Sequence, residues 1–322
     1  MEKQKVTINV FRFNKETDYL PHYDKYELEV SKDEVVLDIL NRIKWEHDGS
    51  FTYRRSCRHG ICGSCAIKVN GRSTLACKER MIDMIELFGN ELTFEPVSKK
   101  RVVKDMVVDK KDFWDKYDAM RPYLIAEIDE HPESENIVSP KEAEKIEEAD
   151  YCIQCGCCYY ACPVVNEANE DYFGPAALLK AYRFTADVRD SDKEDRLKIV
   201  DELGKGVWDC VKCFECTEAC PKDLDPMKKI THLHNQLFEE GVVQNNVASR
   251  HAVGFKKSIE KHGILDEGML VAYSEGFGVL KHIPEAFEMW KKGKIVMPWS
   301  MPKSKKLDEI KKLVKISSTA KF

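Results

Sequence analysis

Cysteine is the residue type whose number and spacing stand out in this sequence. Thirteen cysteines occur in 322 residues, and they fall into three clusters, within residues 57–77, 152–162 and 210–220. Disulfide frameworks staple chains that are too small to bury a core, and a chain of this length is not small. Cysteines separated by gaps of two residues are typical of metal sites, so the clusters predict metal binding.

The first cluster has the spacing of a plant-type [2Fe–2S] site. The predicted ligands, with gaps of four, two and eleven residues, are Cys57, Cys62, Cys65 and Cys77. Gly60 and Gly63 lie between them and leave the backbone free to aim N–H groups at the sulfurs. The main alternative is a tetrahedral zinc site, but zinc sites are usually built from paired CxxC knuckles.

The second and third clusters repeat one pattern, C-x2-C-x2-C-x3-C-P, that is typical of bacterial ferredoxins. In that pattern the fourth cysteine of each run ligates the cluster held by the other run. The pattern predicts one [4Fe–4S] cluster on Cys152, Cys155, Cys158 and Cys220. It predicts a second [4Fe–4S] cluster on Cys162, Cys210, Cys213 and Cys216. Both runs are needed because each supplies one ligand to its neighbour.

These assignments use twelve of the thirteen cysteines and leave Cys157. It lies directly before the ligand Cys158, where both thiols should not reach the same iron, so we expect a buried structural thiol. No nucleotide-binding loop or set of catalytic side chains stands out elsewhere. Three iron–sulfur sites without a substrate pocket predict an electron conduit rather than a complete catalytic site.

Residues 1–106 must position the first cluster. VTINVFRF, YELEV and ELTFEP have the alternation of strands, and SKDE predicts a capping box that opens a helix at Ser31. CAIKV-NG-RSTLAC predicts a hairpin that turns at Asn70 and Gly71. We therefore expect a small mixed sheet that grasps one helix.

Residues 107–240 are predicted to be helical and to hold the other two clusters. Ser139, Pro140 and Glu142 have the types and spacing of a helix start. Residues 241–322 contain no cysteine, and the stretch from Lys291 to Phe322 has ten lysines against two acidic residues, a net charge of +8. This C-terminal extension, basic at its end, is either a solvated tail or a docking arm for an anionic membrane or partner.

Charge and hydropathy argue against two classes of partner. The net charge of −5 gives no reason to expect nucleic acid. No apolar run approaches the ~18 residues of a membrane span, and the N-terminus has no apolar signal core. We expect any link to a membrane to run through another protein or a surface.

Taken together, the motifs resemble the iron–sulfur subunit of succinate dehydrogenase and fumarate reductase over roughly residues 5–240. The segments that carry the resemblance are RRSCRHGICGSCAIKVNGRSTLAC, VVDKKDFWDKYDAMRPYL, YCIQCGCCYYACP, YRFTADVRDSDKEDRL and ECTEACPKDLDP. The resemblance implies an α+β chain: a β-grasp plant-type ferredoxin domain, then an all-α bacterial-ferredoxin-like domain. It also implies a relay between a quinone-linked partner and an FAD-containing flavoprotein that interconverts succinate and fumarate.

The chain departs from the common pattern of that family near the last cluster. Common members have a non-cysteine residue at the position of Cys213 and a [3Fe–4S] cluster there; here the extra thiolate predicts [4Fe–4S], and [3Fe–4S] only if Cys213 is not a ligand. VVNE at 164–167 replaces a tryptophan pair, and Val211 replaces a histidine. The departures resemble the non-classical branch that includes 8-methylmenaquinol:fumarate reductase, whose third subunit is cysteine-rich and similar to heterodisulfide reductase.

The resemblance to this branch favours a membrane-associated fumarate reductase that uses menaquinol in anaerobic respiration. The same relay run as a succinate dehydrogenase is the close alternative. Thiol-driven reduction of fumarate is disfavoured because no cysteine follows Cys220. A zinc-binding interaction protein is the alternative from another class.

The expected location is the periphery of the cytoplasmic membrane, as part of a complex. The chain shows no export signal of its own. The periplasmic side would require co-export with a flavoprotein that carries a twin-arginine leader; otherwise the chain lies on the cytoplasmic side.

Overall fold

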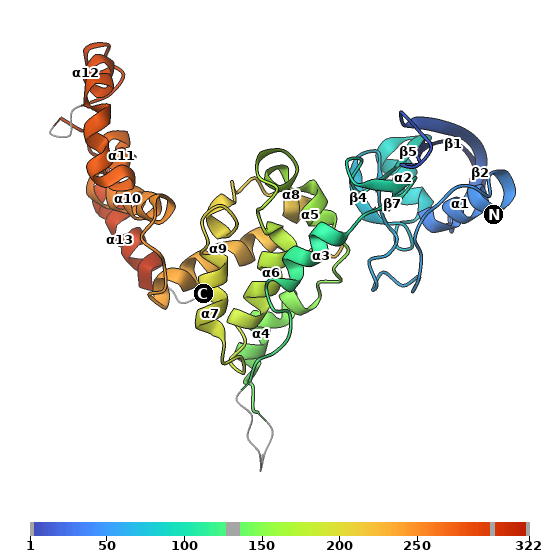
Figure 1. The fold of residues 1–322 in the computed structure, drawn as a ribbon, viewed down its shortest axis with the longest axis horizontal. Coiled ribbons are helices and arrows are strands. Elements are labelled where there is room, and N and C mark those ends of the chain that lie inside the picture. The colour runs from blue at the N-terminus through green and yellow to red at the C-terminus, as the bar shows by residue number, and fades with distance from the viewer. Residues whose placement is uncertain (1–2, 127–135, 297–299, 320–322) are drawn as a thin grey trace. The chain divides into compact units, whose positions relative to one another are not determined.

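The computed structural model describes residues 3–126, 136–296 and 300–319. The chain divides into two compact units, residues 1–236 and 237–322, and each is described by itself. The first unit holds a sheet and a group of helices, and the second is helical (Figure 1).

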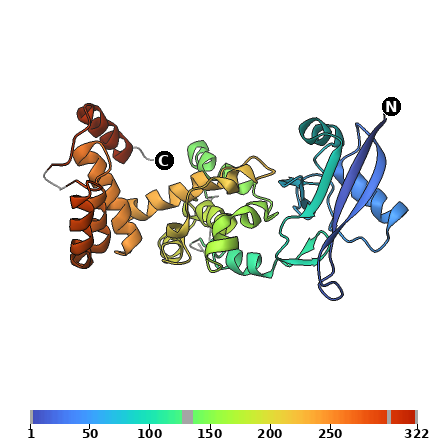
Figure 2. The ribbon, with the colours of Figure 1, turned by 90° about the horizontal axis from the view of Figure 1, so that it is seen from above.

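A five-stranded mixed sheet forms the N-terminal part of the first unit. Its strands are β1 (Lys3–Arg12), β2 (His22–Ser31), β3 (Ala66–Val69), β4 (Arg72–Leu75) and β5 (Glu91–Pro96). Their order is β2-β1-β5-β3-β4, with β1 parallel to β5 and the other neighbours antiparallel. Figure 2 shows β1 and β2 as the long blue pair. The three strand segments predicted from alternation are present in this sheet.

The helix that the sheet grasps is α1 (Val36–Arg42), which a π-helical turn at Ile43–His47 extends. Its apolar side chains, including Val36, Ile39 and Leu40, are fully buried. The prediction that Ser31 caps this helix is wrong. Val35 is extended and forms a β-bridge with Arg80, so the backbone cannot become helical before Val36. A second helix, α2 (Met81–Phe88), was not predicted.

The β3–β4 hairpin turns at Asn70 and Gly71, as predicted. Both residues have positive φ angles, 46° and 84°, which a type I′ turn requires. The turn holds Cys65 and Cys77 on the two sides of the hairpin. A small second hairpin, β6 (Val102–Lys104) with β7 (Val107–Val108), leads out of the sheet.

Seven α-helices follow among the described residues, and the last of them ends just past the boundary between the two units. They are α3 (Lys111–Asp118), α4 (Pro140–Asp150), α5 (Cys157–Ala161), α6 (Gly174–Thr185), α7 (Lys193–Val200), α8 (Glu215–Glu218) and α9 (Pro226–Glu239). Helix α6 is buried almost throughout and packs against α3, α4, α5 and α7. The predicted start of α4 is confirmed, because the Ser139 side chain accepts a hydrogen bond from the Glu142 N–H.

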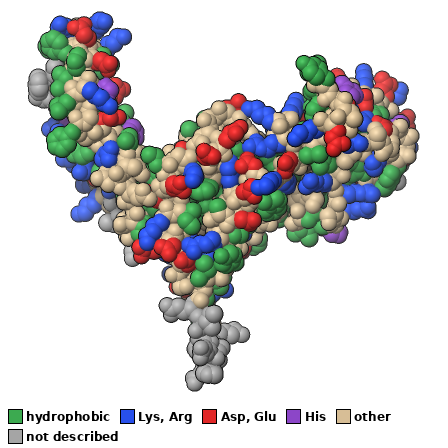
Figure 3. All heavy atoms as spheres, viewed as in Figure 1, with side chains coloured by type: hydrophobic (Ala, Val, Ile, Leu, Met, Phe, Trp, Pro, Cys, Tyr) green, Lys and Arg blue, Asp and Glu red, His purple; other side chains and the backbone are tan. Residues whose placement is uncertain are grey.

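The second unit consists of helices α10 (Val247–His262), α11 (Glu267–Glu275), α12 (Ile283–Lys291) and α13 (Leu307–Thr319), with a 3₁₀ segment at Gly276–His282. Helix α10 packs on α11 and α13. Apolar, basic and acidic side chains share the surface over α10–α12 (Figure 3). The exposed apolar side chains of this unit include Phe277, Phe287 and Trp290. Within the described residues, no helix combines the length and apolar character of a membrane span.

Candidate iron–sulfur centres

The loop before β3 and the hairpin behind it bring the first four cysteines together. The Cys57 side chain helps to lower the pKa of Cys62, and the Cys77 side chain helps to raise the pKa of Cys65, so the members of each pair lie close together. The His59 N–H donates to Cys57 Sγ and the Gly60 N–H donates to Cys77 Sγ, each at 3.3 Å. Backbone donors aimed at sulfur stabilise negative charge there.

The thiols of Cys62 and Cys65 have different surroundings, and their pKa values shift in opposite directions. Burial raises the pKa of Cys62, but hydrogen bonds from Ser64 and Cys57 outweigh it, so that the pKa falls to about 6. Burial raises the pKa of Cys65 to about 12. One side of the loop therefore lies inside the domain, whereas Cys62 is exposed.

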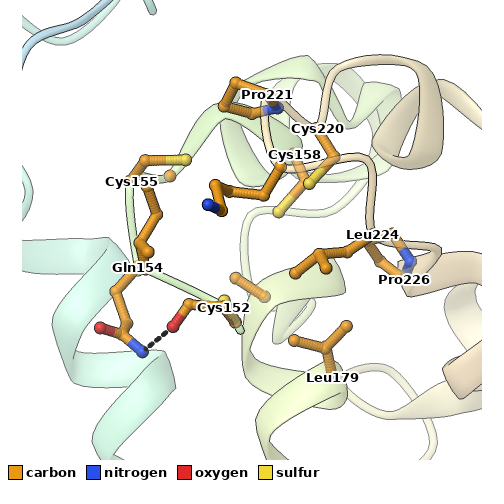
Figure 4. Close-up of a pocket in the computed structure, with 13 residues that line it drawn as sticks. Cys152, Gln154, Cys155, Cys158, Leu179, Cys220, Pro221, Leu224 and Pro226 are labelled. Atoms are coloured by element: carbon orange, nitrogen blue, oxygen red, sulfur yellow. Dashed lines mark hydrogen bonds between the residues drawn. The ribbon is translucent and has the colours of Figure 1, made fainter. Parts of the chain in front are cut away.

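The second cysteine run and the end of the third line one cavity. Its walls include the thiols of Cys152, Cys155, Cys158 and Cys220, with apolar residues such as Leu179 and Leu224 between them. Figure 4 shows the four cysteine side chains arranged around this space. The cavity therefore collects three thiols from one run and the fourth from the other.

A second cavity has the complementary set of thiols. It is lined by Cys162, Cys210, Cys213 and Cys216, together with Val164, Tyr172, Phe214, Met227 and Ile230. Burial raises the pKa of Cys162, and hydrogen bonds from the N–H groups of Val165 and Val164 offset part of this rise. Burial also raises the pKa of Cys210, and hydrogen bonds from the Lys212 N–H and the Tyr172 hydroxyl offset part of this rise.

Cys157 lines neither cavity. It is fully buried, as expected, and its thiol donates a hydrogen bond to Cys155. Cys157 therefore has a structural role besides filling the core, because its hydrogen bond stabilises negative charge on Cys155.

Three side chains near the thiols were missed by sequence reasoning. The Lys110 Nζ donates to the backbone oxygen of Cys155 at 2.8 Å, and burial lowers the pKa of this amine. Tyr172, 1% exposed, donates to Cys210. Phe214 is 55% exposed although it lines the second cavity. No spacing rule identifies them, because each is brought to the cysteines only by the folding of the chain.

The donor sets fit iron–sulfur clusters. Thiolates are the ligands of such clusters, four face each cavity, and N–H or O–H donors point at several of the sulfurs. Among the described residues, no three His, Cys, Asp or Glu side chains are arranged to hold a single metal ion.

Comparisons with known proteins support two cluster-binding domains. Residues 7–115 match a family described as a 2Fe-2S iron-sulfur cluster binding domain, and residues 148–224 match a 4Fe-4S dicluster domain. The predicted α+β class, with a sheet domain followed by a helical domain, is confirmed.

Curated relatives are similar over most of their length. The mitochondrial succinate dehydrogenase [ubiquinone] iron-sulfur subunit of Dictyostelium discoideum is 37% identical over 71% of this chain and 81% of its own length. The fumarate reductase iron-sulfur subunit of Haemophilus influenzae is 36% identical over 70% of this chain and 90% of its own. Relatives of both names match, so the comparison leaves the direction of the reaction open.

A solved structure has the same fold. A chain of the Mycobacterium smegmatis Sdh1 complex in the apo form superposes with a TM-score of 0.64 at 23% identity, over 76% of this chain and all of that one. Together with the two domain matches and the curated relatives, this leads to one conclusion. The chain belongs to the family of iron–sulfur subunits of succinate dehydrogenase and fumarate reductase, and it is an electron-transfer subunit of that oxidoreductase complex.

Proposed function

We propose that the chain holds three clusters on twelve cysteines. The [2Fe–2S] ligands are Cys57, Cys62, Cys65 and Cys77, the first [4Fe–4S] ligands are Cys152, Cys155, Cys158 and Cys220, and the second [4Fe–4S] ligands are Cys162, Cys210, Cys213 and Cys216. The two cavities support the crossed sets, since each is lined by four of these thiols. The proposed domains are residues 1–106, 107–240 and 241–322.

When bound, such clusters supply one-electron oxidation and reduction. The chain's own residues hold them in place and set their surroundings. Backbone donors such as the Gly60 N–H offset negative charge on the sulfurs. Apolar side chains such as Leu179 and Ile230 exclude water from the cavities.

The relay is proposed to serve a membrane-associated fumarate reductase. The electrons come from a third subunit, which is cysteine-rich, resembles heterodisulfide reductase and oxidises menaquinol. This chain passes them to the FAD-containing subunit, which reduces fumarate to succinate. The observation that carries this proposal is Cys213, which lines the second cavity beside three other thiols. A fourth thiol there is the feature that separates the chain from the common [3Fe–4S] pattern.

The surface at the second cavity supports a partner at that end. Val211 is 64% exposed and Phe214 is 55% exposed, and Cys213 between them is exposed as well. An exposed ligand beside two exposed apolar side chains suits contact with another protein, which would bring a redox group close and exclude water.

Assays on the purified complex test the direction. We expect menaquinol-dependent fumarate reduction to be faster than succinate-dependent reduction of menaquinone. The reverse ratio would identify a succinate dehydrogenase, the close alternative. A colourless preparation that contains zinc and no iron would overturn both and identify a zinc-binding interaction protein, since zinc thiolates do not absorb visible light.

The proposed location is the periphery of the cytoplasmic membrane within this complex. Which side it lies on follows from the partner: a flavoprotein with a twin-arginine leader places the complex on the periplasmic side. Protease accessibility in spheroplasts, compared with lysed cells, distinguishes the two sides.

A further inference from the structure

Lys110 stands where the sheet domain meets the first [4Fe–4S] cavity. It follows β7 and directly precedes α3. Its side chain is half buried, and its Nζ donates to the backbone oxygen of Cys155. This lysine is therefore held against a proposed cluster ligand rather than extended into solvent.

The charges around the Lys110 amine are mostly sulfurs. Burial lowers the pKa of the amine, whereas the nearby thiols of Cys155, Cys157 and Cys62 act to raise it. In the part of the chain that the structure describes, no Asp or Glu forms an ion pair with it, and the amine lies over the Phe113 ring, 5.8 Å from its centroid. The positive charge thus lies at Cys155, a proposed ligand of the first [4Fe–4S] cluster, without a carboxylate partner among the described residues.

The two cluster loops touch at the same place. A Cβ on Gly63, in the [2Fe–2S] loop, would lie 2.7 Å from the Cα of Cys155 and 2.9 Å from the oxygen of Ile153. Backbone therefore meets backbone with no space between the loops. The contact thus brings the [2Fe–2S] loop next to Cys155, whose backbone oxygen accepts the hydrogen bond from Lys110.

Reduction adds one negative charge to a cluster that is already bound by thiolates, and no bond forms or breaks. A nearby positive charge stabilises the reduced state more than the oxidised state, and partial burial strengthens the effect because solvent screening is weaker. The potential of an iron–sulfur centre rises accordingly.

We propose that Lys110 is a positive charge shared by the [2Fe–2S] centre and the first [4Fe–4S] centre, and that it raises the reduction potentials of both while leaving the second [4Fe–4S] centre unaffected. The inference rests on the proposed ligand sets. It goes beyond them because it assigns a potential-setting role to a residue that binds no iron.

The neighbouring residue provides a matched control. Lys111 has the same charge and is adjacent in sequence, but its side chain is 77% exposed and pairs with Asp115. Lys110→Met removes the shared charge, Lys110→Arg keeps it, and Lys111→Met removes a charge that faces solvent.

The test is an EPR-monitored redox titration of the three centres in the purified complex. For Lys110→Met we expect the reduced-to-oxidised ratio of the first two centres, at fixed ambient potential, to fall about tenfold, which is ~59 mV for a one-electron couple. The second [4Fe–4S] centre should not shift. Lys110→Arg and Lys111→Met should leave all three centres near their wild-type values.

Three results would overturn the inference: no shift in Lys110→Met, a shift in only one of the two centres, or an equal shift in all three. Should Lys110→Met not assemble its clusters, Lys110→Gln removes the charge and retains a donor for the Cys155 oxygen, and the same criteria apply. A failure of the ligand sets is seen separately, because the wild-type complex itself would then lack one of the three centres.

Discussion

The two cysteine runs of the helical domain have one spacing and one backbone shape but different surroundings. In each run the third and fifth positions have positive φ: Gln154 and Gly156 in the first run, Lys212 and Phe214 in the second. The second cysteine is 8% exposed in the first run, at Cys155, whereas its counterpart in the second run is exposed. A repeated sequence therefore builds one enclosed site and one open site.

The difference lies in what packs against the turn. The [2Fe–2S] loop covers the first run through Gly63. In the second run the fifth position carries an exposed aromatic ring, Phe214, in a left-handed conformation that costs a non-glycine residue about 1–2 kcal/mol. Backbone strain and apolar exposure therefore coincide at Phe214, next to the proposed ligand Cys213.

The largest effect on stability is expected from a substitution in the loop that covers the first cysteine run. Gly63→Ala places a Cβ 2.7 Å from backbone that cannot move aside, so we expect a loss of about 3 kcal/mol or more in the free energy of unfolding. Gly60→Ala is the control, because φ is similarly positive (66° against 68°) but the nearest atom is 3.9 Å away. Urea unfolding should show Gly60→Ala losing only about 1 kcal/mol; equal losses would contradict the packing argument.

The next largest effect is expected at the open site. Cys213→Ala removes an exposed proposed ligand, so the second cluster should retain three irons and the chain should stay folded. Iron analysis should return about one iron less per chain than the wild type, and the oxidised protein should gain the EPR signal of a three-iron cluster. An unchanged iron content would exclude Cys213 as a ligand.

Smaller changes in the free energy of unfolding are expected from substitutions at the fifth position of each run. A Cβ at Gly156 would lie 2.8 Å from the Tyr160 ring, so Gly156→Ala should lower the free energy of unfolding by about 1–3 kcal/mol. Phe214→Gly should change it by less than about 1 kcal/mol, because relief of strain offsets the added freedom of glycine. Urea denaturation of the loaded protein measures both; a large loss for Phe214→Gly would mean that its ring is structural.

The smallest effect is expected from a single hydroxyl group. Tyr172→Phe removes the donor to Cys210, which stabilises negative charge on that sulfur. We expect the potential of the second [4Fe–4S] centre alone to fall, by less than ~59 mV. Redox titration checks this, and a shift confined to the [2Fe–2S] centre would contradict the second ligand set.

Local sequence rules predicted those features that depend on local chemistry. Asn70-Gly71 formed its turn and Ser139 capped its helix, because the residues concerned are neighbours in the chain. The prediction that Ser31 caps a helix was wrong because of a long-range contact. Val35 pairs with Arg80, 45 positions away, and this pairing keeps the backbone extended.

Within the site, spacing indicated the cysteines but not what surrounds them. Lys110 and Lys111 are indistinguishable in sequence, yet one donates to the backbone oxygen of Cys155 and the other extends into solvent. Phe214 occupies a left-handed position that a sequence rule would give to glycine. Such features depend on contacts between loops far apart in the chain, so only the folded structure shows them.

The central claim is that two crossed sets of four thiolates hold two cubanes, the second of them completed by Cys213. Iron analysis of the anaerobically purified wild-type complex, together with EPR of its oxidised form, tests this most directly. We expect about ten irons per copy of this chain, once iron bound by partner subunits is subtracted, and no three-iron signal. About nine irons with a full three-iron signal would contradict it.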